Sequence, residues 1–372
     1  MSRVVVAPDS FKGTIGADAA AVALADGWRA VRGDDAPLLR PMADGGEGTL
    51  DAFARAVAGS VRMPVRVTGP ADTPLDAHWL LLPPTPDAPE GTGVVELAGT
   101  SGIEALGSPP RLSPLAAHTL GFGQAIAAAL DHGVSRLVLG VGSSCSTDGG
   151  VGLLSALGAR FLDSAGAPVP LGGRGLALIA RVETDALVPL PPGGAAVLTD
   201  VTNPLLGPEG AAAVFGPQKG ASPLQVAALE AGLRVLAYRL GGEPDAAGAG
   251  AAGGAGYGLL AWGATLQSGA DAVARLIGLG EAMAGASVVV TGEGSFDGQS
   301  ARGKVPGRVA AQARAAGVPV ALVAGRIDPA ADATGFAATL SLAELAGSPD
   351  AAMADAARWL RAAGEALART FA

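Results

Sequence analysis

The chain contains few residues of three types that often carry function. It has one cysteine, three histidines and three lysines, against 22 arginines, in 372 residues. A single cysteine, Cys145, excludes an intrachain disulfide framework. His78, His118 and His132 are dispersed without the spacing of metal ligands, so we expect no zinc site. No apolar run approaches the roughly 20 residues of a membrane span without a Gly, Asp or Arg interruption.

The charge balance is acidic, with 34 Asp and Glu residues against 25 Lys and Arg residues and a net charge of -9. No basic run interrupts this balance, so we expect no nucleic-acid or membrane partner, which would need a positive patch. The first residues lead straight into a β-branched run rather than the apolar core of a signal peptide, which predicts a cytoplasmic protein. The sequence does not separate a monomer from a homodimer.

The length and the pattern of the chain predict two α/β domains. With 372 residues the chain exceeds the size at which single hydrophobic cores stop growing, about 250 to 300 residues. Short apolar runs are followed by polar turns and alanine-rich helical patterns, which is typical of a mainly parallel sheet with helices on both faces. The strands expected from this pattern are 3–7, 136–141, 196–199, 287–291 and 318–324.

Two regions depart from this pattern. Between residues 62 and 97, short alternating runs are broken by Pro and Gly, and we expect a small antiparallel element there. The stretch 241–258 is rich in Gly and Ala, so it is either a linker or a glycine-lined loop beside a site.

The three lysines, Lys12, Lys219 and Lys304, each have a glycine as a direct neighbour. An ammonium group is a compact, strongly hydrated point charge, and glycine allows a ligand to come close to the backbone. A chain that otherwise uses arginine for its cations therefore places lysine where a small anion would bind. Phosphate is the anion that this pattern favours.

The segment 288–304 carries the strongest functional signal. Three valines form an expected buried strand, and we expect a loop after it that holds Glu293, Asp297 and Lys304. Phosphoryl transfer requires a cation for the phosphate oxygens, a carboxylate for Mg²⁺ and backbone N–H groups near a helix start, and this loop offers all three. The alternative is a surface turn with solvated charges.

Further polar residues follow other expected strands or precede helices, where ligands bind in open α/β sheets. Asp9, Ser10 and Lys12 come after the first strand, with Thr14 close by, and could bind an anion at the following helix. The alternative is that Ser10 or Thr14 is an ordinary helix N-cap. Asp44 and Glu47, separated by two glycines, are either part of a site or charges that complement a helix N-terminus.

Two later loops extend this set. The loop 140–150 is rich in hydroxyl groups and is either a phosphate-binding nest or a simple helix cap. Asp200 is a candidate metal ligand or base, and its alternative is a turn-forming role before Pro204.

Other familiar devices are missing or weak. The run 298–304 resembles a phosphate-binding P-loop, but Val305 stands where the motif needs a hydroxyl group. The glycine pairs of this glycine-rich chain produce dinucleotide-fingerprint fragments by chance. Cys145 has no histidine near it in sequence, so we expect a packing residue rather than a nucleophile.

Taken together, these segments resemble the bacterial type I glycerate kinases, the glycerate 2-kinase group, over nearly the whole chain. The matching segments are 7–14 (APDSFKGT), 41–49 (PMADGGEGT), 148–150 (DGG), 200–205 (DVTNPL), 215–220 (FGPQKG) and 291–294 (TGEG), with Asp297, Gln299, Gly303 and Lys304. The run 142–147 (GSSCST) and Arg326 depart from the pattern of the family.

The resemblance implies ATP- and Mg²⁺-dependent phosphorylation of D-glycerate, usually at the 2-hydroxyl, to give 2-phosphoglycerate and ADP. It also implies a flavodoxin-like parallel-sheet domain built from both chain ends, 1–65 and 287–372. A second α/β domain with a mixed sheet, 66–286, is expected between these two parts.

The residues and the resemblance together predict a site. Catalytic roles are expected for Asp9, Lys12, Asp44, Asp200 and Lys304. Glycerate is expected to bind Ser10, Asp44, Glu47, Asn203, Lys219 and Arg326. ATP is expected to bind Ser143, Ser144, Thr147, Asp148, Glu293, Gly294, Ser295, Gln299 and Lys304, with Mg²⁺ held by Asp200 and Asp297. Either Asp44 or Asp200 would accept the proton of the substrate hydroxyl.

Three other functions stay open at the level of sequence. The first is a kinase of another small hydroxy acid that uses the same ATP site. The second is a non-catalytic sensor of an anion or nucleotide, which would be expected to lack metal-holding acids; here Asp9, Asp44, Asp148, Asp200, Glu293 and Asp297 are all present. The third is a nicotinamide-dependent dehydrogenase, which the missing fingerprint disfavours.

Overall fold

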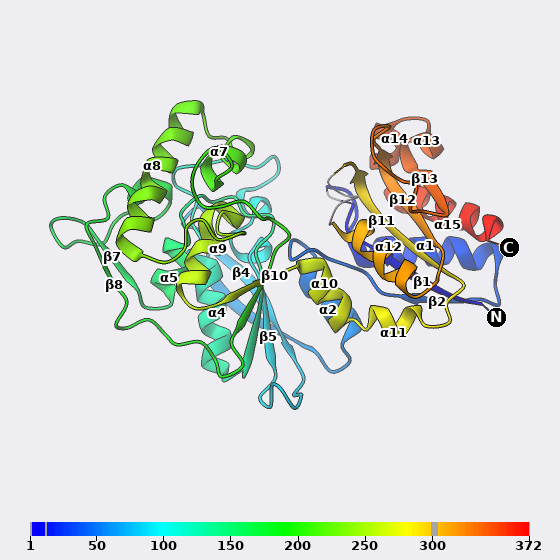
Figure 1. Ribbon diagram of the computed structural model, residues 1–372, viewed down its shortest axis with the longest axis horizontal. Helices are drawn as coiled ribbons and strands as arrows, with labels where there is room; N and C mark the ends of the chain where they lie inside the picture. Colours follow the sequence, from blue (N-terminus) through cyan, green and yellow to red (C-terminus); the bar gives the residue numbers. More distant parts are fainter. Residues whose placement is uncertain (1, 12, 299–303, 372) are drawn as a thin grey trace. The chain divides into compact units, whose positions relative to one another are not determined.

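The computed structural model describes residues 2–11, 13–298 and 304–371 (Figure 1). The chain divides into two compact units. The terminal unit contains the described parts of Met1–Asp44, Asp51–Ala58 and Ala270–Ala372, and the inserted unit contains Gly45–Leu50 and Gly59–Gly269. The domain limits expected from the sequence, 1–65 with 287–372 and 66–286, remain a prediction about independent folding, which limited proteolysis would test.

The terminal unit is built on a five-stranded parallel sheet with the order β13-β12-β11-β1-β2. Its strands are β1 (Arg3–Pro8), β2 (Ala36–Leu39), β11 (Val288–Phe296), β12 (Val320–Ile327) and β13 (Ala338–Ser341). The valines of β1 pair with the valines of β11, and both runs are buried. Strands that are apolar on both faces require cover on both sides, as the sequence predicts for a parallel α/β sheet.

Strand β11 is longer than the sequence predicts. We expected the strand to end at residue 291 and a loop to hold Glu293, but β11 continues to Phe296. Glu293 and Ser295 pair with residues of β12. Gly325 permits this pairing at short range, because a Cβ at that position would lie 2.3 Å from the carbonyl oxygen of Gly294. The predicted loop over 292–296 is therefore wrong, and its side chains are fixed by strand geometry.

Helices cover the sheet of the terminal unit. They are α1 (Ala17–Val31), α11 (Leu279–Met283), α12 (Val305–Ala315), α13 (Leu342–Ala346), α14 (Pro349–Ala354) and α15 (Ala356–Thr370). Helices α2 (Thr49–Ala56) and α10 (Gly269–Leu276) begin in the inserted unit and continue in the terminal unit. Helices α1 and α15 pack backbone to backbone, since a Cβ at Gly27 would lie 1.9 Å from the carbonyl oxygen of Arg361.

The inserted unit is built on a six-stranded mixed sheet with the order β10-β9-β6-β5-β4-β3. Its strands are β3 (Val61–Thr68), β4 (Pro74–Leu82), β5 (Thr92–Glu96), β6 (Arg136–Gly140), β9 (Ala195–Leu198) and β10 (Thr265–Gln267). Strands β3, β4 and β5 are antiparallel neighbours, which confirms the antiparallel element expected between residues 62 and 97. The remaining pairs, β5–β6, β6–β9 and β9–β10, are parallel. A separate hairpin is formed by β7 (Arg160–Leu162) and β8 (Arg181–Glu183).

The helices of the inserted unit surround this mixed sheet. They are α3 (Ala98–Ser101), η1 (Ile103–Leu106), α4 (Leu120–His132), α5 (Val151–Ala156), α6 (Gly173–Leu176), α7 (Ala211–Phe215), η2 (Pro217–Lys219), α8 (Pro223–Leu240) and α9 (Ala251–Ala261). Helix α8 starts with a capping box in which Ser222 and Gln225 satisfy each other's backbone N–H groups.

The glycine-rich stretch 241–258 is packed structure rather than a linker. Its second half enters α9, where Ala252, Gly253 and Gly254 adopt left-handed backbone angles. A Cβ at Gly253 would lie 2.1 Å from the carbonyl oxygen of Ser146. Only glycine therefore lets this turn lie against the loop 142–147.

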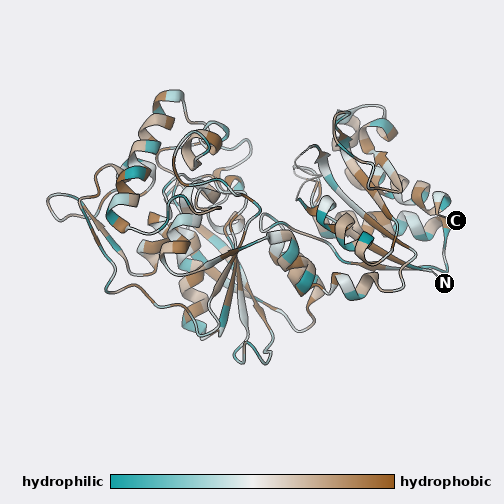
Figure 2. Cartoon of the chain, viewed as in Figure 1, coloured by the Kyte–Doolittle hydropathy of each residue, from teal (hydrophilic) through white to brown (hydrophobic). Residues whose placement is uncertain are grey.

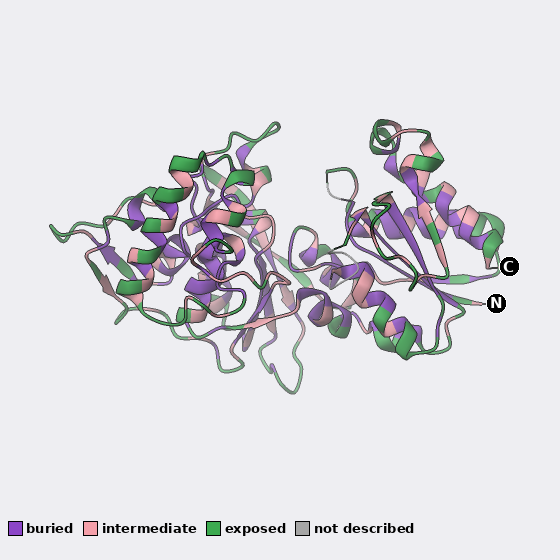
Figure 3. Ribbon diagram, turned by 45° about the horizontal axis from the view of Figure 1, so that its top comes forward, coloured by how far each residue is buried: buried purple, intermediate pink, exposed green. Residues whose placement is uncertain are grey.

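Hydropathy and burial follow the same plan in both units. The strands of the two main sheets are mostly apolar (Figure 2) and buried (Figure 3), while the helices present polar, exposed outer faces. Within the residues that the structure describes, no helix has both the length and the apolar character needed to cross a bilayer. The α/β class, with one parallel and one mixed sheet, agrees with the sequence prediction.

Candidate active site

A pocket of about 430 Å³ opens in the terminal unit at the carboxyl ends of β1, β11 and β12. Its polar lining comes from segments that are far apart in the sequence: Asp9, Ser10, Thr14, Asp44, Glu293, Ser295, Asp297, Lys304 and Arg326. Ligands of open parallel sheets bind at this edge, because the loops after the strands meet there. The pocket thus brings together eight of the site residues that the sequence predicts, besides Gly294.

The first wall of this pocket is the turn that follows β1. Asp9 and Ser10 are both buried. The backbone N–H of Asp9 donates to the carbonyl oxygen of Gly292 at 2.8 Å, and the N–H of Ser10 donates to Oδ1 of Asp9 at 2.7 Å. These bonds fix the Asp9 carboxylate beside β11. Lys12, which we expected in the same turn, lies outside the described residues.

The second wall is made by the ends of β11 and β12 and the start of α12. Arg326 donates from Nε to Oγ of Ser295 at 2.9 Å. The ammonium nitrogen of Lys304 lies 4.0 Å from Oδ1 of Asp297, and both side chains are partly exposed. Helix α12 begins directly after Lys304, so its first N–H groups add positive potential on the same side. Gln299, the remaining residue predicted here, lies outside the described part of the chain.

Residues 45–50 are built into the inserted unit, at the ends of β6 and β9. The N–H of Gly142 donates to the carbonyl oxygen of Gly45 at 2.9 Å. A Cβ at Gly45 would lie 2.4 Å from the carbonyl oxygen of Leu198, and Gly45 has a φ of +94°. This contact between backbones requires glycine. Glu47, in the same segment, is exposed.

Glu96 is a buried carboxylate that the sequence reasoning missed. It ends β5 and accepts a hydrogen bond from the N–H of Leu50 through Oε2, at 3.4 Å. Leu50 belongs to the first turn of α2, where a negative charge is favourable. The signal was available in the sequence, since Glu96 follows Val94 and Val95 as Asp9 follows the valines of β1.

The loop 142–147 is anchored by a buried lysine. Lys219 is 4% exposed, and its ammonium group donates to the carbonyl oxygen of Ser146 and to Oγ of Ser144. Burial lowers the pKa of Lys219 to about 8, and interactions with Cys145 and Asp148 partly oppose this shift. Burial also raises the pKa of Cys145 to about 11, which makes its thiol a poor nucleophile at neutral pH. Ser143 has a φ of +60°, an unusual angle for a residue with a side chain.

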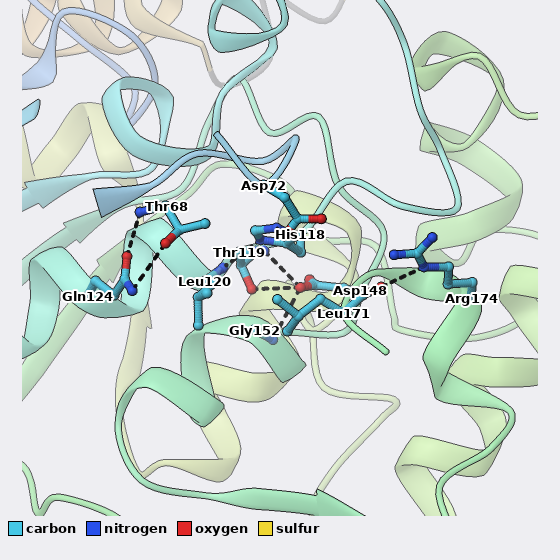
Figure 4. Close-up of polar contacts among 10 residues, drawn as sticks. All are labelled: Thr68, Asp72, His118, Thr119, Leu120, Gln124, Asp148, Gly152, Leu171 and Arg174. Carbon is cyan, nitrogen blue, oxygen red and sulfur yellow. Dashed lines mark hydrogen bonds and ion pairs between the residues drawn. The ribbon is translucent and has the colours of Figure 1, made fainter. Parts of the chain in front are cut away.

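Asp148 is enclosed by protein donors (Figure 4). Its Oδ2 accepts from the N–H and the hydroxyl of Thr119, both at 2.8 Å, and from the N–H of Gly152 at 3.2 Å. Its Oδ1 accepts from the N–H of Gly150 at 3.2 Å. Asp148 and Thr119 are completely buried. The carboxylate therefore ties the starts of α4 and α5 together.

His118 extends this network toward the β3–β4 turn (Figure 4). It is completely buried, and its Nε2 lies 3.1 Å from Oδ1 of Asp72. Its Nδ1 accepts from the N–H of Leu120 at 3.3 Å, so the neutral ring carries its proton on Nε2 and donates it to Asp72. The cluster pins a surface turn to the start of α4.

Comparison with known proteins decides the family. A model of the glycerate kinase family matches residues 4–372. The chain belongs to the glycerate kinase family. Among the relatives of this kinase, the glycerate kinase of Bacillus subtilis is 39% identical over 87% of the chain and 85% of its own length. The glycerate 2-kinase of Escherichia coli K12 is 37% identical over 87% of the chain and 85% of its own length.

A solved structure from Salmonella typhimurium LT2, of a protein provisionally named glycerate kinase 2, resembles this member of the glycerate kinase family. It is 36% identical and has a TM-score of 0.81, with 99% of this chain and 98% of that chain covered. The fold described above is thus the fold of a known kinase family, and the enzyme class predicted from the sequence is confirmed.

The remaining predicted residues of this glycerate kinase family member lie in loops that follow β6 and β9 of the inserted unit. Asp200 follows β9 and accepts from the N–H of Gly269 at 3.2 Å. Asn203 donates from its amide to the carbonyl oxygen of Glu209 at 2.7 Å. The hydroxyl of Thr147 is buried and has no hydrogen-bond partner in the described structure. Among the described residues no three His, Cys, Asp or Glu side chains form a metal cluster.

Proposed function

We propose that this enzyme transfers the terminal phosphoryl group of ATP to the 2-hydroxyl of D-glycerate and releases 2-phosphoglycerate and ADP. Membership of the glycerate kinase family supports the reaction class. The name of the Escherichia coli relative, glycerate 2-kinase, supports the 2-position. A kinase of another small hydroxy acid is the alternative, since the same donor site would serve it.

The observation that carries the proposal is the chemistry of the pocket in the terminal unit. Lys304 and Arg326 supply cations there, and Lys304 directly precedes α12, whose N-terminal end carries positive potential. Groups of this kind stabilise the charge on a phosphoryl group in transit, because they are already oriented when the reaction begins. The four carboxylates of the pocket, Asp9, Asp44, Glu293 and Asp297, would otherwise be an unlikely lining for an anionic ligand.

That excess of carboxylates fits a magnesium ion. Mg²⁺ in kinases is typically held by one or two carboxylates, with phosphate oxygens and water as its other ligands, so a cluster of three protein acids is not required. Asp297, which lines this pocket, would hold it. Asp200, the second metal ligand expected from the sequence, stays a prediction. The ion, when bound, neutralises charge on the phosphate oxygens.

Binding and activation of the acceptor require a base for the 2-hydroxyl and hydrogen-bond donors or cations for the carboxylate of glycerate. Asp44 or Asp200 would accept the proton of the 2-hydroxyl. Ser10, Arg326 and Lys12 are candidates for the glycerate carboxylate, since hydroxyl and cationic donors pair well with carboxylate oxygens. Glu47, Asn203 and Lys219 keep their assignment to glycerate as predictions. Lys219 would have to act from a buried position.

ATP roles in the inserted unit are less direct. Ser143, Ser144 and Thr147 present hydroxyl groups in the loop 142–147, and we keep them as candidate ATP contacts. Asp148 is assigned to ATP by the sequence argument alone, because its visible bonds all go to protein donors.

A coupled ADP assay with a panel of acceptors tests this function. We expect D-glycerate to be the best acceptor among D-glycerate, L-glycerate, glycolate, D-lactate and tartronate, and phosphorus NMR of the product to show the 2-phosphate. A higher kcat/KM for another acid would move the assignment to that acid, and a 3-phosphate product would refute the regiochemistry.

Cell fractionation tests the proposed cytoplasmic location, and light scattering decides between monomer and homodimer.

A further inference from the structure

The pocket of the terminal unit has a third wall, which is apolar and which the phosphoryl chemistry does not use. This wall is contributed by the helices that follow β13 rather than by the strand ends: Leu342, Pro349, Ala352, Met353 and Ala356. Figure 1 labels α13 and α14 beside the β12 and β13 edge of the sheet. None of these five side chains can donate a hydrogen bond, and only the weakly accepting sulfur of Met353 is polarisable.

Met353 is the most unusual member of the wall. It is 59% exposed and lines the pocket from α14, while Leu342 and Ala352 beside it are buried. Methionine is flexible and polarisable and makes favourable contacts with aromatic rings. The alanines at 352 and 356 are small and apolar. The wall therefore offers apolar contact rather than donors for a second anion.

The two substrates differ in what they could place against such a wall. Glycerate is a three-carbon acid that carries oxygen on every carbon, so burying it against leucine and methionine would leave polar groups without partners. ATP combines a charged phosphate tail with a planar aromatic base. A single cavity of about 430 Å³ that joins cations and carboxylates to an apolar wall matches the donor in both respects.

We infer that the wall formed by Leu342, Pro349, Ala352, Met353 and Ala356 binds the adenine ring of the nucleotide, with the phosphate chain directed toward Lys304. The inference rests on the proposed function, since it takes ATP as the donor. It assigns α13, α14 and the start of α15 to nucleotide affinity and leaves the acceptor to other residues. Met353 becomes the contact that can be varied without disturbing the core, because its side chain is exposed.

The test compares two ligands that share phosphates but differ in the base. Binding of ADP and of inorganic tripolyphosphate is measured by titration calorimetry for the wild type, Met353→Gln, Met353→Leu and Leu345→Gln. Glutamine has nearly the shape of methionine and no charge, so it removes apolar contact alone. Leu345 is an exposed apolar residue of α13 that does not line the pocket, which makes it a matched control.

We expect Met353→Gln to weaken ADP roughly three- to tenfold and to leave tripolyphosphate unchanged, because only the base loses contact. Met353→Leu and Leu345→Gln should keep ADP affinity within about twofold of the wild type. Unchanged ADP binding in Met353→Gln, or equal weakening of ADP and tripolyphosphate, would overturn the inference.

Kinetics separate this inference from the proposed function. If Met353→Gln raises KM for glycerate and not for ATP, the wall belongs to the acceptor, and the inference fails while the glycerate kinase assignment stands. If the wild type phosphorylates no glycerate but ADP binding shows the expected pattern, the acceptor assignment fails and the base site stands.

Discussion

Replacing Asp148 with alanine is the sharpest test of how the inserted unit is held together. The substitution removes the acceptor for four donors: the N–H and hydroxyl of Thr119 and the N–H groups of Gly150 and Gly152. Thr119 and Asp148 are completely buried, so water does not readily replace the carboxylate. Alanine would leave the starts of α4 and α5 with unsatisfied donors in an apolar setting.

The expected loss follows from these four bonds. A hydrogen bond to a charged group contributes about 1.5 to 3 kcal/mol, and bonds that share two oxygens are not additive. Removing one partner from a buried charged network costs about 3 to 5 kcal/mol, and we take ~4 kcal/mol for Asp148→Ala. For a domain of this size, 1 kcal/mol shifts the melting temperature by about 2 to 4 °C, so the expected drop is about 8 to 16 °C.

Calorimetry of the whole chain measures this drop, and Asp163→Ala is the matched control. Asp163 also accepts two backbone N–H groups, from Ala165 and Ala167, but in a surface turn where water can replace it. We expect the control to shift the melting temperature by less than about 3 °C. An Asp148→Ala protein that melts with the wild type while its KM for ATP rises tenfold would refute the structural role and restore the sequence-based assignment to ATP.

Three further predictions concern the lysines and a glycine. Lys304→Met should lower kcat/KM for glycerate about 10²- to 10³-fold with an unchanged melting temperature; a loss under tenfold in the coupled assay would remove Lys304 from catalysis. Burial lowers the pKa of Lys219 to about 8, so the unfolded chain binds more protons above that pH. Urea titrations should show the free energy of unfolding rising by ~2 kcal/mol between pH 7 and 9.5. The same rise in a Lys219→Met protein would show that Lys219 does not cause it. Gly45→Ala should destabilise by about 2 to 4 kcal/mol through its clash with Leu198, whereas Gly48→Ala, at a φ of +87° in open space, should cost only about 1 kcal/mol; equal melting temperatures for the two would exclude the clash.

The sheets could be predicted from the sequence where a local pattern decides them. The valine runs predict β1 and β11, and the alternation of apolar and polar residues predicts β3 and β4. The continuation of β11 to Phe296 could not be predicted in this way, because it depends on a partner strand whose Gly325 permits close pairing. This pairing depends on a segment that is distant in the sequence, so the local run Gly-Glu-Gly-Ser does not predict it.

The candidate site was predictable in outline and not in detail. Asp9, Glu293 and Lys304, which the sequence analysis proposes as site residues, line one pocket in the structure, and their roles stay predictions. For Lys219 the structure adds what the sequence pattern does not display: Gly220 ends the short helix η2 in a left-handed conformation, and the ammonium group donates to the carbonyl oxygen of Ser146. The assignment of Lys219 to glycerate stays a prediction. The sequence shows which charged side chains are present. Their burial determines whether they can contact a ligand or bond only to other groups of the protein.

That distinction divides the predicted residues into two groups with different experimental signatures. In the terminal unit Asp297, Lys304 and Arg326 line an open cavity and keep exposed surface, so removing one changes what a ligand meets and should appear in kcat or KM. In the inserted unit Asp148 and Lys219 are buried among protein partners, so removing one must first change the free energy of unfolding. A single set of variants, measured for both the free energy of unfolding and the kinetic constants, therefore tests both groups. A terminal-unit residue whose removal changes only the free energy of unfolding, or an inserted-unit residue whose removal changes only kcat or KM, has been assigned to the wrong group.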